Sequence, residues 1–446
     1  MPAVASDTIA PARRCAYAVL RATFERGAYT DRALRARATG LDTRDRALAM
    51  RLASGAVQRA GTLDHLLSAL AERPARQLDP PLLAGLRLGL YELLYLGGAP
   101  DYAIVADAVQ LAKQHGRGGH GLVNAVLRRA AREGASALLG SLSDATPEQA
   151  TVMHSHPEWI VRMWWQQLGS GEARALLARD NEPAELALRA NTLVSDASTL
   201  ARQLPVACHR DPLLAEAVVL EGPFDVHGSP LFRRGAFLAQ SRAAMLVAHA
   251  LDPRAGESVL DLCAAPGGKA THAAALMGGE GVVLAVERHR GRAQALARTA
   301  RRLRARNVRV EVADARQARR DGRSFDRVLV DPPCSGLGTL QARPDLRWRV
   351  TPEGVASMAA TQAEILAAGA RAVCPGGLLV YSTCTICATE NEQVIAAFLD
   401  SHPDFSLDDL AAELPALAAP GAGGFVLTLP HRDRTAGFFI ARLRRS

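Results

Sequence analysis

The stretch DLCAAPGGKAT, at residues 261–271, decides the fold expected for the second half of the chain. It ends an apolar run and opens a helical pattern, so it predicts a turn between a strand and a helix. Gly267 and Gly268 let the backbone approach a ligand closely, and the helix N-terminus favours an anionic or polar group. A P-loop would need a glycine where Cys263 stands and Ser or Thr where Ala270 stands. A nucleoside cofactor without phosphates fits this turn better.

Apolar runs alternate with helical patterns from this turn to the end of the chain. Five of the runs predict strands, and they read SVLDLC, GVVLAVE, VRVEVAD, FDRVLVD and GGLLVYSTC, with GFVLTL and GFFIARL in the tail. This alternation is typical of an open, mostly parallel, doubly wound sheet. Ligands of such sheets bind at the carboxyl ends of the strands.

Acidic residues close three of these strands. Glu287 follows the second strand, about twenty residues after Gly267, where an acid takes ribose hydroxyls. Asp314 ends the third strand and Asp331 the fourth. Single acids at strand ends are common, but the series together with the glycine turn indicates a pocket for S-adenosylmethionine, whose sulfonium and amino groups are cationic.

Two cysteines follow the fourth and fifth strands. VLVDPPCSGLGTL, at residues 328–340, places Cys334 in a turn rich in proline and glycine, and GGLLVYSTC ends on Cys384. Neighbouring strands lie about 4.8 Å apart, so both thiols would flank one cleft beside the cofactor methyl group. Carbon 5 of a pyrimidine becomes nucleophilic when a thiolate adds to carbon 6. The pair therefore indicates methyl transfer to that carbon, with one thiol capturing the base and a second group serving its release.

The composition limits the compartment and the cofactors. The chain has 446 residues, of which 48% are hydrophobic and 22% charged. It shows no signal-peptide or bilayer-spanning pattern, so we expect a cytoplasmic protein without a membrane partner. Seven scattered cysteines indicate free thiols. Cys384-Thr-Ile-Cys387 is formally a CxxC pair, but no second pair or histidine cluster supports zinc. We expect a monomer without a metal.

The charge pattern favours a polyanionic partner. The net charge is +8, and the two ends of the chain are basic whereas the middle is mildly acidic. A solvated arginine-rich surface would look the same. Only two of the 53 basic residues are lysines, and one of them, Lys269, stands in the glycine turn. This placement indicates a need for a compact ammonium group.

The chain divides into five parts by composition and periodicity. They are a disordered tail, an all-helical domain, a Gly/Ser/Ala linker, a small α+β lobe and the sheet domain, at residues 1–11, 12–135, 136–155, 156–236 and 237–446. Tyr17, Leu20 and Phe24 illustrate the helical spacing of the second part.

Several motifs resemble those of a known family. DLCAAPGGK, DPPCSGLGT with RPDLRW after it, and YSTCTICATENE resemble the NOL1/NOP2/Sun family of RNA cytosine-C5 methyltransferases. ARRCAYAVLRATFERGAYTDRAL, LLAGLRLGLYELLYL and GLVNAVLRR resemble a NusB-type helical RNA-binding domain. The combination is similar to bacterial family members that methylate one cytosine of 16S rRNA. It implies a Rossmann-like methyltransferase domain that uses S-adenosylmethionine, and a small RNA-binding lobe beside it.

The resemblance also implies roles for individual residues. Cys384 would be the nucleophile and Cys334 would assist product release, while Asp331 and Lys269 would face the target base. The residues implied to line the cofactor site are Cys263, Ala264, Ala265, Pro266, Gly267, Gly268, Lys269, Glu287, Asp314 and Asp331. The candidate RNA contacts are Arg128, Arg129 and Arg343.

Two stretches depart from the family pattern. Gln240-Ser241 stands where the family often has an acid after the glutamine, and Ala388-Thr389-Glu390-Asn391 stands where it usually has Pro-Glu-Glu-Asn. Neither departure touches the two cysteines, but both leave the edges of the site open.

Two other functions are compatible with the sequence. One is methylation of carbon 5 in another RNA, such as tRNA, and the NusB-like domain is the only argument for rRNA. The other is a non-catalytic rRNA-binding assembly factor that keeps the methyltransferase fold as a platform. The presence of both cysteines argues against this second alternative.

Overall fold

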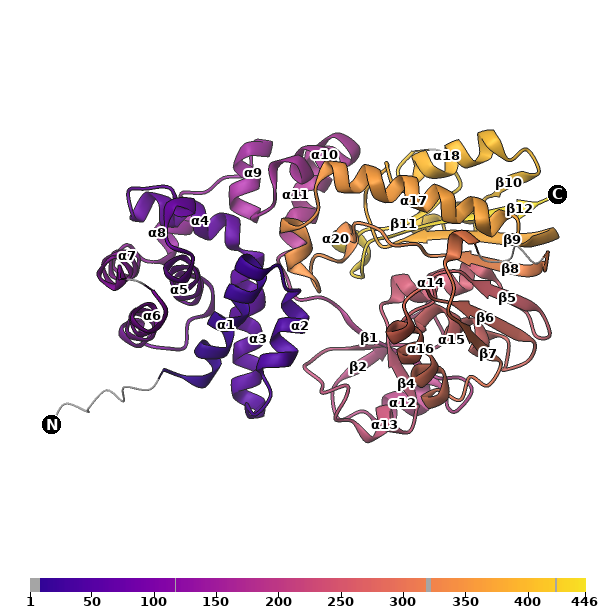
Figure 1. Ribbon diagram of the computed structural model, residues 1–446, viewed down its shortest axis with the longest axis horizontal. Helices are drawn as coiled ribbons and strands as arrows, with labels where there is room; N and C mark the ends of the chain where they lie inside the picture. The colour runs from indigo at the N-terminus through magenta and orange to yellow at the C-terminus, as the bar shows by residue number, and fades with distance from the viewer. Residues whose placement is uncertain (1–8, 117, 318–321, 422) are drawn as a thin grey trace. The chain divides into compact units, whose positions relative to one another are not determined.

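The computed structural model describes residues 9–446 except 117, 318–321 and 422. The chain forms two compact units (Figure 1). The first comprises Met1–Glu182 together with Leu340–Arg349, and the second comprises Pro183–Thr339 together with Val350–Ser446. Among the described residues, no helix has the length and apolar character needed to cross a membrane.

The first unit is built of helices, as the spacing of its apolar residues predicts. Tyr17 and Leu20 are buried in its core, and Phe24 packs against that core. The prediction of an all-helical domain is confirmed. Its α-helices are α1 (Pro11–Arg26), α2 (Thr30–Arg37), α3 (Thr43–Gln58), α4 (Ala60–Leu70), α5 (Pro80–Tyr91), α6 (Asp101–His115), α7 (His120–Glu133), α8 (Ala135–Gly140), α9 (Pro147–His154), α10 (Glu158–Leu168) and α11 (Ser170–Arg179).

The N-terminal tail is shorter than predicted. Residues 1–8 lie outside the described residues, but Ile9 is buried and α1 begins at Pro11. Proline suits the first turn of a helix, because its fixed φ is helical and its missing N–H would have no partner there. The prediction of a disordered tail is therefore wrong for residues 9–11.

The stretch predicted as a linker, residues 136–155, contains most of α8 and all of α9. Thr146 accepts a hydrogen bond from the backbone N–H of Gln149, and Pro147 occupies the first turn, so the sequence starts a helix locally. Helix α9 packs against α4 and α10. The Gly/Ser/Ala composition that suggested a linker thus accompanies capping residues that build a short helix.

The segment Leu340–Arg349, which follows the Cys334 loop in sequence, is part of the first unit. Arg347 holds it there, because its buried guanidinium donates four hydrogen bonds of 3.0–3.2 Å. Its acceptors are the carbonyl oxygens of Gln58, Ser155 and Asp180 and Oδ1 of Asn181. The RPDLRW motif thus contains a buried structural anchor.

A small antiparallel sheet begins the second unit. Its strand order is β2-β3-β1-β4, and the elements are β1 (Leu186–Ala190), α12 (Ala197–Gln203), β2 (Cys208–Arg210), β3 (Ala217–Leu220), α13 (Pro230–Arg233) and β4 (Phe237–Ala239). This confirms the α+β lobe. Helix α10, near the start of the range predicted for the lobe, belongs to the first unit.

A larger sheet forms the centre of the second unit. Its order is β10-β12-β9-β8-β5-β6-β7, with β11 paired to β12. Strands β5 to β9 pair in parallel, and β10, β11 and β12 pair antiparallel. The bounds are β5 (Ser258–Asp261), β6 (Val282–Val286), β7 (Val308–Glu311), β8 (Phe325–Val330), β9 (Val373–Thr383), β10 (Phe405–Asp408), β11 (Val426–Thr428) and β12 (Phe438–Arg445). All seven predicted strands are confirmed, and β10 was missed.

Helices cover both faces of this sheet, as Figure 1 shows. One layer contains α14 (Arg242–Leu251), α15 (Gly268–Leu276) and α16 (Arg290–Arg302), and the other contains α17 (Pro352–Ala370) and α18 (Glu392–Ser401). Two short helices, α19 (Leu410–Glu413) and α20 (Pro430–Asp433), lie in the C-terminal connections. The doubly wound architecture is confirmed. It places the carboxyl ends of β5, β6, β7 and β8 along one edge.

Candidate active site

The glycine turn leads from β5 into α15, as predicted. Gly267 has a φ of +104°, a left-handed conformation that favours glycine, and an added Cβ would lie 3.4 Å from the Leu296 side chain. No side chain caps the N-terminus of α15. The first N–H groups of a helix have no partner inside the helix, so this end can receive a polar or anionic group.

Four acidic residues stand at the carboxyl ends of adjacent parallel strands. Asp261 is fully buried, and its Oδ2 has no hydrogen-bond partner among the described residues. Burial, aided by the charge of Asp331, raises the pKa of Asp261 to about 7. Glu287 is buried and accepts a 2.8 Å hydrogen bond from the backbone N–H of His289. The predicted site residues began at Cys263 and so missed Asp261, although its place at a strand end was visible.

Asp314, the third acid, is already engaged by a neighbour. It accepts hydrogen bonds from the backbone and the guanidinium of Arg316 at 2.7–3.1 Å. These hydrogen bonds lower the pKa of Asp314 to about 2. The carboxylate is therefore ionised at neutral pH, at the edge where the cofactor site was predicted.

Lys269 and Asp331 form an ion pair at the centre of the site. Nζ of Lys269 lies 2.7 Å from Oδ2 of Asp331, and Ser382 donates a 3.0 Å hydrogen bond to Oδ1. Burial disfavours the ammonium group, but the carboxylate of Asp331 outweighs that cost and raises the pKa of Lys269. The charge of a Cys384 thiolate raises it further. The lysine is therefore a fixed cation beside both the acid and the thiol.

The two cysteines meet as the strand pairing predicts. Sγ of Cys334 lies 3.3 Å from Sγ of Cys384, and both residues are partly exposed. The hydrogen bond to Cys384 and burial raise the pKa of Cys334 well above its ordinary value, so this side chain is a thiol at neutral pH. Such a thiol can donate a hydrogen bond to its neighbour's sulfur.

Glu390 holds the loop that carries Cys334 in place through hydrogen bonds. It was not among the predicted site residues. This buried carboxylate accepts hydrogen bonds from the backbone N–H and the hydroxyl of Ser335, and from Nε2 of Gln362. Tyr381 donates a 2.6 Å hydrogen bond to its carbonyl oxygen. The signal in the sequence was the Glu-Asn pair that follows the second cysteine, which Glu390 and Asn391 share with the family pattern.

Gly338, in the loop that carries Cys334, ties this loop to two other parts of the chain through backbone hydrogen bonds. Its N–H donates to the carbonyl oxygen of Cys384 at 3.0 Å, and its carbonyl accepts from the N–H of Gly437 at 2.7 Å. An added Cβ would lie only 2.0 Å from the Gly437 carbonyl oxygen. The loop and β12 therefore approach too closely for any side chain at this position.

The candidate RNA contacts all lie in the first unit. Arg128, on α7, is exposed and lines an open hollow of about 420 Å³ with Tyr102 and Arg132. Arg129, next to it, is paired with Glu72 and Glu133, as a solvated helix end would be. Arg343 is exposed in the segment Leu340–Arg349. The three do not share one chemical environment.

Three parts of the chain match known families. Residues 248–444 match the family described as 16S rRNA methyltransferase RsmB/F, residues 10–132 match the NusB family, and residues 156–227 match the ferredoxin-like domain of RsmF/B-like methyltransferases. These matches agree with the helical, lobe and sheet regions described above.

Similar whole chains include two bacterial relatives. The probable ribosomal RNA small subunit methyltransferase B of Bacillus subtilis is 37% identical, over 91% of this chain and 92% of that protein. The ribosomal RNA small subunit methyltransferase B of Thermus thermophilus is 38% identical, over 93% and 92%. Among solved structures, PH0851 is 26% identical with a TM-score of 0.79 over 98% of both chains. The chain therefore belongs to the RsmB family of 16S ribosomal RNA methyltransferases.

Proposed function

We propose that this protein transfers the methyl group of S-adenosylmethionine to carbon 5 of a cytosine in 16S rRNA, through a covalent bond between Cys384 and the base. The proposal rests on the 3.3 Å separation of the Cys334 and Cys384 sulfur atoms at the carboxyl edge of the sheet. Methyl transfer to an amino nitrogen has no use for two thiols, whereas carbon 5 must first be activated by a nucleophile at carbon 6.

The edge formed by β5 and β6 fits S-adenosylmethionine. Its buried Asp261 has a carboxylate oxygen without a partner among the described residues, and α15 has an uncapped N-terminus. Glu287, at the end of β6, has the position of an acid that binds ribose hydroxyls. When bound there, the cofactor supplies an electrophilic methyl group.

Capture of the base is assigned to Cys384. The Lys269 ammonium interacts electrostatically with the sulfur of Cys384. It therefore stabilises the thiolate that attacks carbon 6. As the Sγ–C6 bond forms, electron density moves onto the pyrimidine ring. Asp331, held by Lys269 and Ser382, is positioned to hydrogen-bond to the ring and stabilise the activated base.

Release is assigned to Cys334. After methyl transfer, carbon 5 loses its proton to a solvent water molecule, the C5–C6 double bond re-forms, and the bonding pair of the C6–S bond returns to Cys384. A neighbouring thiol 3.3 Å away can donate a hydrogen bond to that departing thiolate. The raised pKa of Cys334 keeps the donor protonated for this step.

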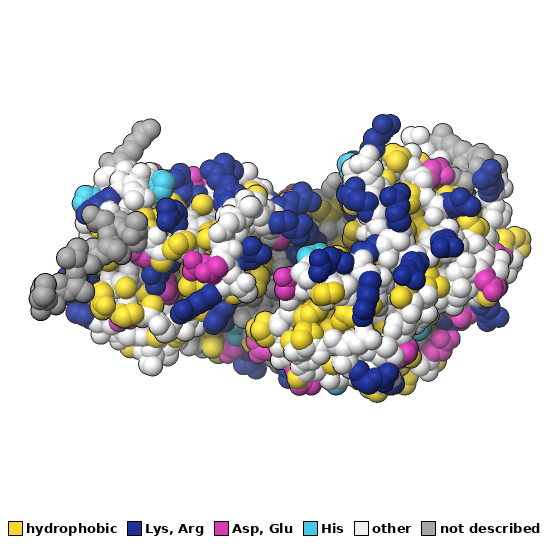
Figure 2. Space-filling model, turned by 90° about the horizontal axis from the view of Figure 1, so that it is seen from below, with side chains coloured by type: hydrophobic (Ala, Val, Ile, Leu, Met, Phe, Trp, Pro, Cys, Tyr) yellow, Lys and Arg dark blue, Asp and Glu magenta, His cyan; other side chains and the backbone are white. Residues whose placement is uncertain are grey.

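RNA is the substrate that the surface chemistry favours. Arg and Lys side chains are spread across the face shown in Figure 2, and the net charge is +8. Tyr102, which is 78% exposed, lies beside Arg128 in the hollow of the first unit, so a ring and a cation are available to an unpaired base and its phosphate.

The test is methyl transfer from labelled S-adenosylmethionine to 16S rRNA, followed by digestion and mass spectrometry of the nucleosides. Wild type should form 5-methylcytidine, and Cys384→Ala should form none. Cys387→Ala is the matched control, because that buried thiol lies outside the pair and its loss should leave transfer intact.

Three other outcomes of this experiment would change the proposed substrate, function or mechanism. Methylation of tRNA in preference to 16S rRNA would retain the chemistry and change the substrate. Binding of rRNA and cofactor without transfer would instead support an assembly factor. A methylated nitrogen in place of 5-methylcytidine would contradict the covalent mechanism.

A further inference from the structure

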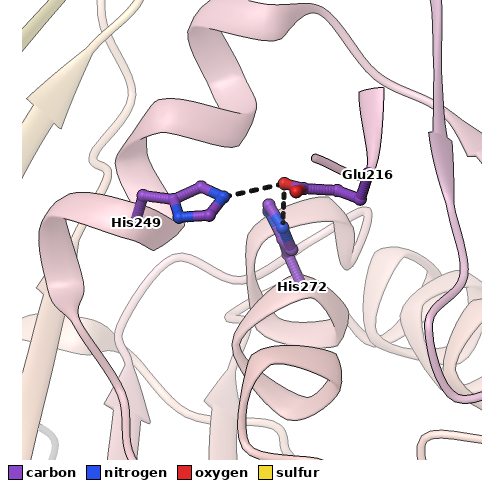
Figure 3. Close-up of side chains that lie close together, drawn as sticks. All are labelled: Glu216, His249 and His272. Atoms are coloured by element: carbon purple, nitrogen blue, oxygen red, sulfur yellow. Dashed lines mark hydrogen bonds and ion pairs between the residues drawn. The ribbon is translucent and has the colours of Figure 1, made fainter. Parts of the chain in front are cut away.

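Three side chains from separate elements converge in the second unit, as Figure 3 shows. Glu216 directly precedes β3, His249 lies on α14 and His272 lies on α15. Oε1 of Glu216 lies 2.8 Å from Nε2 of His249 and 2.8 Å from Nε2 of His272. The three possible ligand atoms lie within 4.8 Å of one another. One carboxylate oxygen thus faces two imidazole nitrogens.

His272 is buried without the hydrogen bonds that a buried imidazole requires. Its side chain is 1% exposed, and neither ring nitrogen makes a hydrogen bond among the described residues. Nε2 is close to Glu216, but the contact lacks hydrogen-bond geometry. Buried polar groups are normally satisfied, so this nitrogen has an unused lone pair or N–H beside a carboxylate.

Glu216 is a buried carboxylate, and its charge needs a partner. Its side chain is 6% exposed, and among the described residues its ion pairs are both with histidines. The buried Arg189 donates its described hydrogen bonds elsewhere, to Gln240, Gly268 and Thr271. Buried carboxylates are normally paired with a cation or coordinate a metal.

We propose that Glu216, His249 and His272 form a binding site for Zn²⁺. Two imidazoles and a carboxylate are a zinc ligand set, and imidazole disfavours Mg²⁺ and Ca²⁺. With metal–ligand bonds of about 2.0–2.1 Å in a tetrahedron, ligand atoms lie about 3.3 Å apart. The two oxygen–nitrogen distances here are each 2.8 Å, so a small outward shift of the side chains would admit the ion. His249 is 38% exposed, so an ion can reach the site from its side.

The proposed ion would join the lobe to the cofactor-binding layer within the second unit. It links the start of β3 to α14 and α15, and α15 carries Lys269 three residues before His272. The role inferred is structural, since the site uses none of the reacting groups. This site is additional to the methyl-transfer chemistry and stands without it.

The test is Zn²⁺ binding by the full chain after chelator treatment, measured by metal analysis and by competition with a chromogenic chelator. Wild type should bind one equivalent, and His249→Ala and Glu216→Gln should bind at least tenfold more weakly. His209→Ala is the matched control, because His209 forms an exposed pair with Glu221 in the same lobe and should not affect binding.

The paired thiols of the active site could also take up Zn²⁺, so Cys384→Ser is measured in parallel. Uptake that survives His249→Ala but disappears in Cys384→Ser would overturn the proposal. Absence of stoichiometric uptake by wild type would also overturn it and leave a metal-free hydrogen-bonded cluster.

A second readout separates the site from a folding defect. Zn²⁺ bound to the native state should raise the thermal midpoint of wild type. His249→Ala should fold, since this side chain is partly exposed, but its midpoint should not respond to Zn²⁺. An equal response of both proteins would contradict the assignment.

Discussion

Sγ of Cys334 lies 3.3 Å from Sγ of Cys384, although 50 residues separate them in the chain. Parallel pairing of β8 with β9, in which Val330 faces Tyr381, brings the two strand ends together. The hydrogen bond between the sulfurs and burial raise the pKa of Cys334. In this geometry Cys334 stays protonated beside Cys384.

Removal of Cys334 should therefore slow release more than capture. In Cys334→Ala, we expect a covalent protein–RNA complex to accumulate, with turnover reduced at least tenfold, because the departing Cys384 thiolate loses its hydrogen-bond donor. Denaturing gels with labelled 16S rRNA measure the complex. Cys384→Ala should give no complex under the same conditions, and normal turnover by Cys334→Ala would contradict the assignment.

Asp331→Asn should lower methyl transfer by about 100-fold or more, the effect typical of losing a positioned acid or base. The change removes the carboxylate that Lys269 and Ser382 hold, and leaves the lysine without its partner. Single-turnover transfer measures the effect, with the exposed Asp400→Asn on α18 as control. Equal rates for the two variants would exclude a role for Asp331 in the reaction.

Glu390→Gln should loosen the loop that carries Cys334. The amide would present an NH₂ group to donors from Ser335 or Gln362, so at least one hydrogen bond is lost at a buried position. We expect a loss of about 1–3 kcal/mol in unfolding free energy and slower product release. Denaturant unfolding and turnover measure both, and the exposed Glu353→Gln on α17 should change neither.

Asp180 should make the stability of the chain depend on pH. It is fully buried, and burial raises its pKa to about 7 despite the opposing charges of Arg347 and Arg179. The folded state therefore binds the proton more tightly than the unfolded state, and this contribution to stability is lost as the pH rises toward 7.

The matching variant is Asp180→Asn, which cannot ionise. Wild type should lose stability relative to this variant between about pH 4 and pH 7, measured by denaturant unfolding of the full chain. The exposed Asp31→Asn on α2 serves as the control and should follow wild type. A constant difference between wild type and Asp180→Asn across this range would rule out the titration.

Arg128 and Arg129 should differ in their contribution to RNA binding. Arg128 is exposed beside Tyr102, whereas Arg129 is paired with Glu72 and Glu133. Arg128→Ala should weaken 16S rRNA binding and reduce the slope of log K against log salt by about 1. Arg129→Ala should have a smaller effect on both. Equal salt slopes for wild type and Arg128→Ala would show that Arg128 does not contact an RNA phosphate.

Much of the fold was predictable because its signals are local. Apolar periodicity identified the helices of the first unit and all strands of the large sheet except β10, a four-residue strand at the edge. The prediction of disorder failed for residues 9–11, and the predicted linker contains helices that composition did not indicate. There Pro11 and the Thr146 cap started helices. A cap outweighs composition, because it satisfies backbone groups that composition does not describe.

The sequence by itself determined where the candidate site residues stand. The turn before α15, the acids at the strand ends and the two cysteines all stand at positions set by their own strand, so they are visible without knowledge of distant contacts. Parallel strand order then implied that the cysteines meet, and the structure confirms it.

Only the tertiary structure decided which distant side chains share an environment. Glu390 beneath Ser335, Arg347 anchored in the first unit, and Glu216 between His249 and His272 each depend on elements that lie far apart in the chain. Their sequence neighbourhoods are ordinary, because a hydrogen bond or a ligand set depends on three-dimensional distance and burial. Those quantities exist only after the sheet has ordered its strands and the helices have packed.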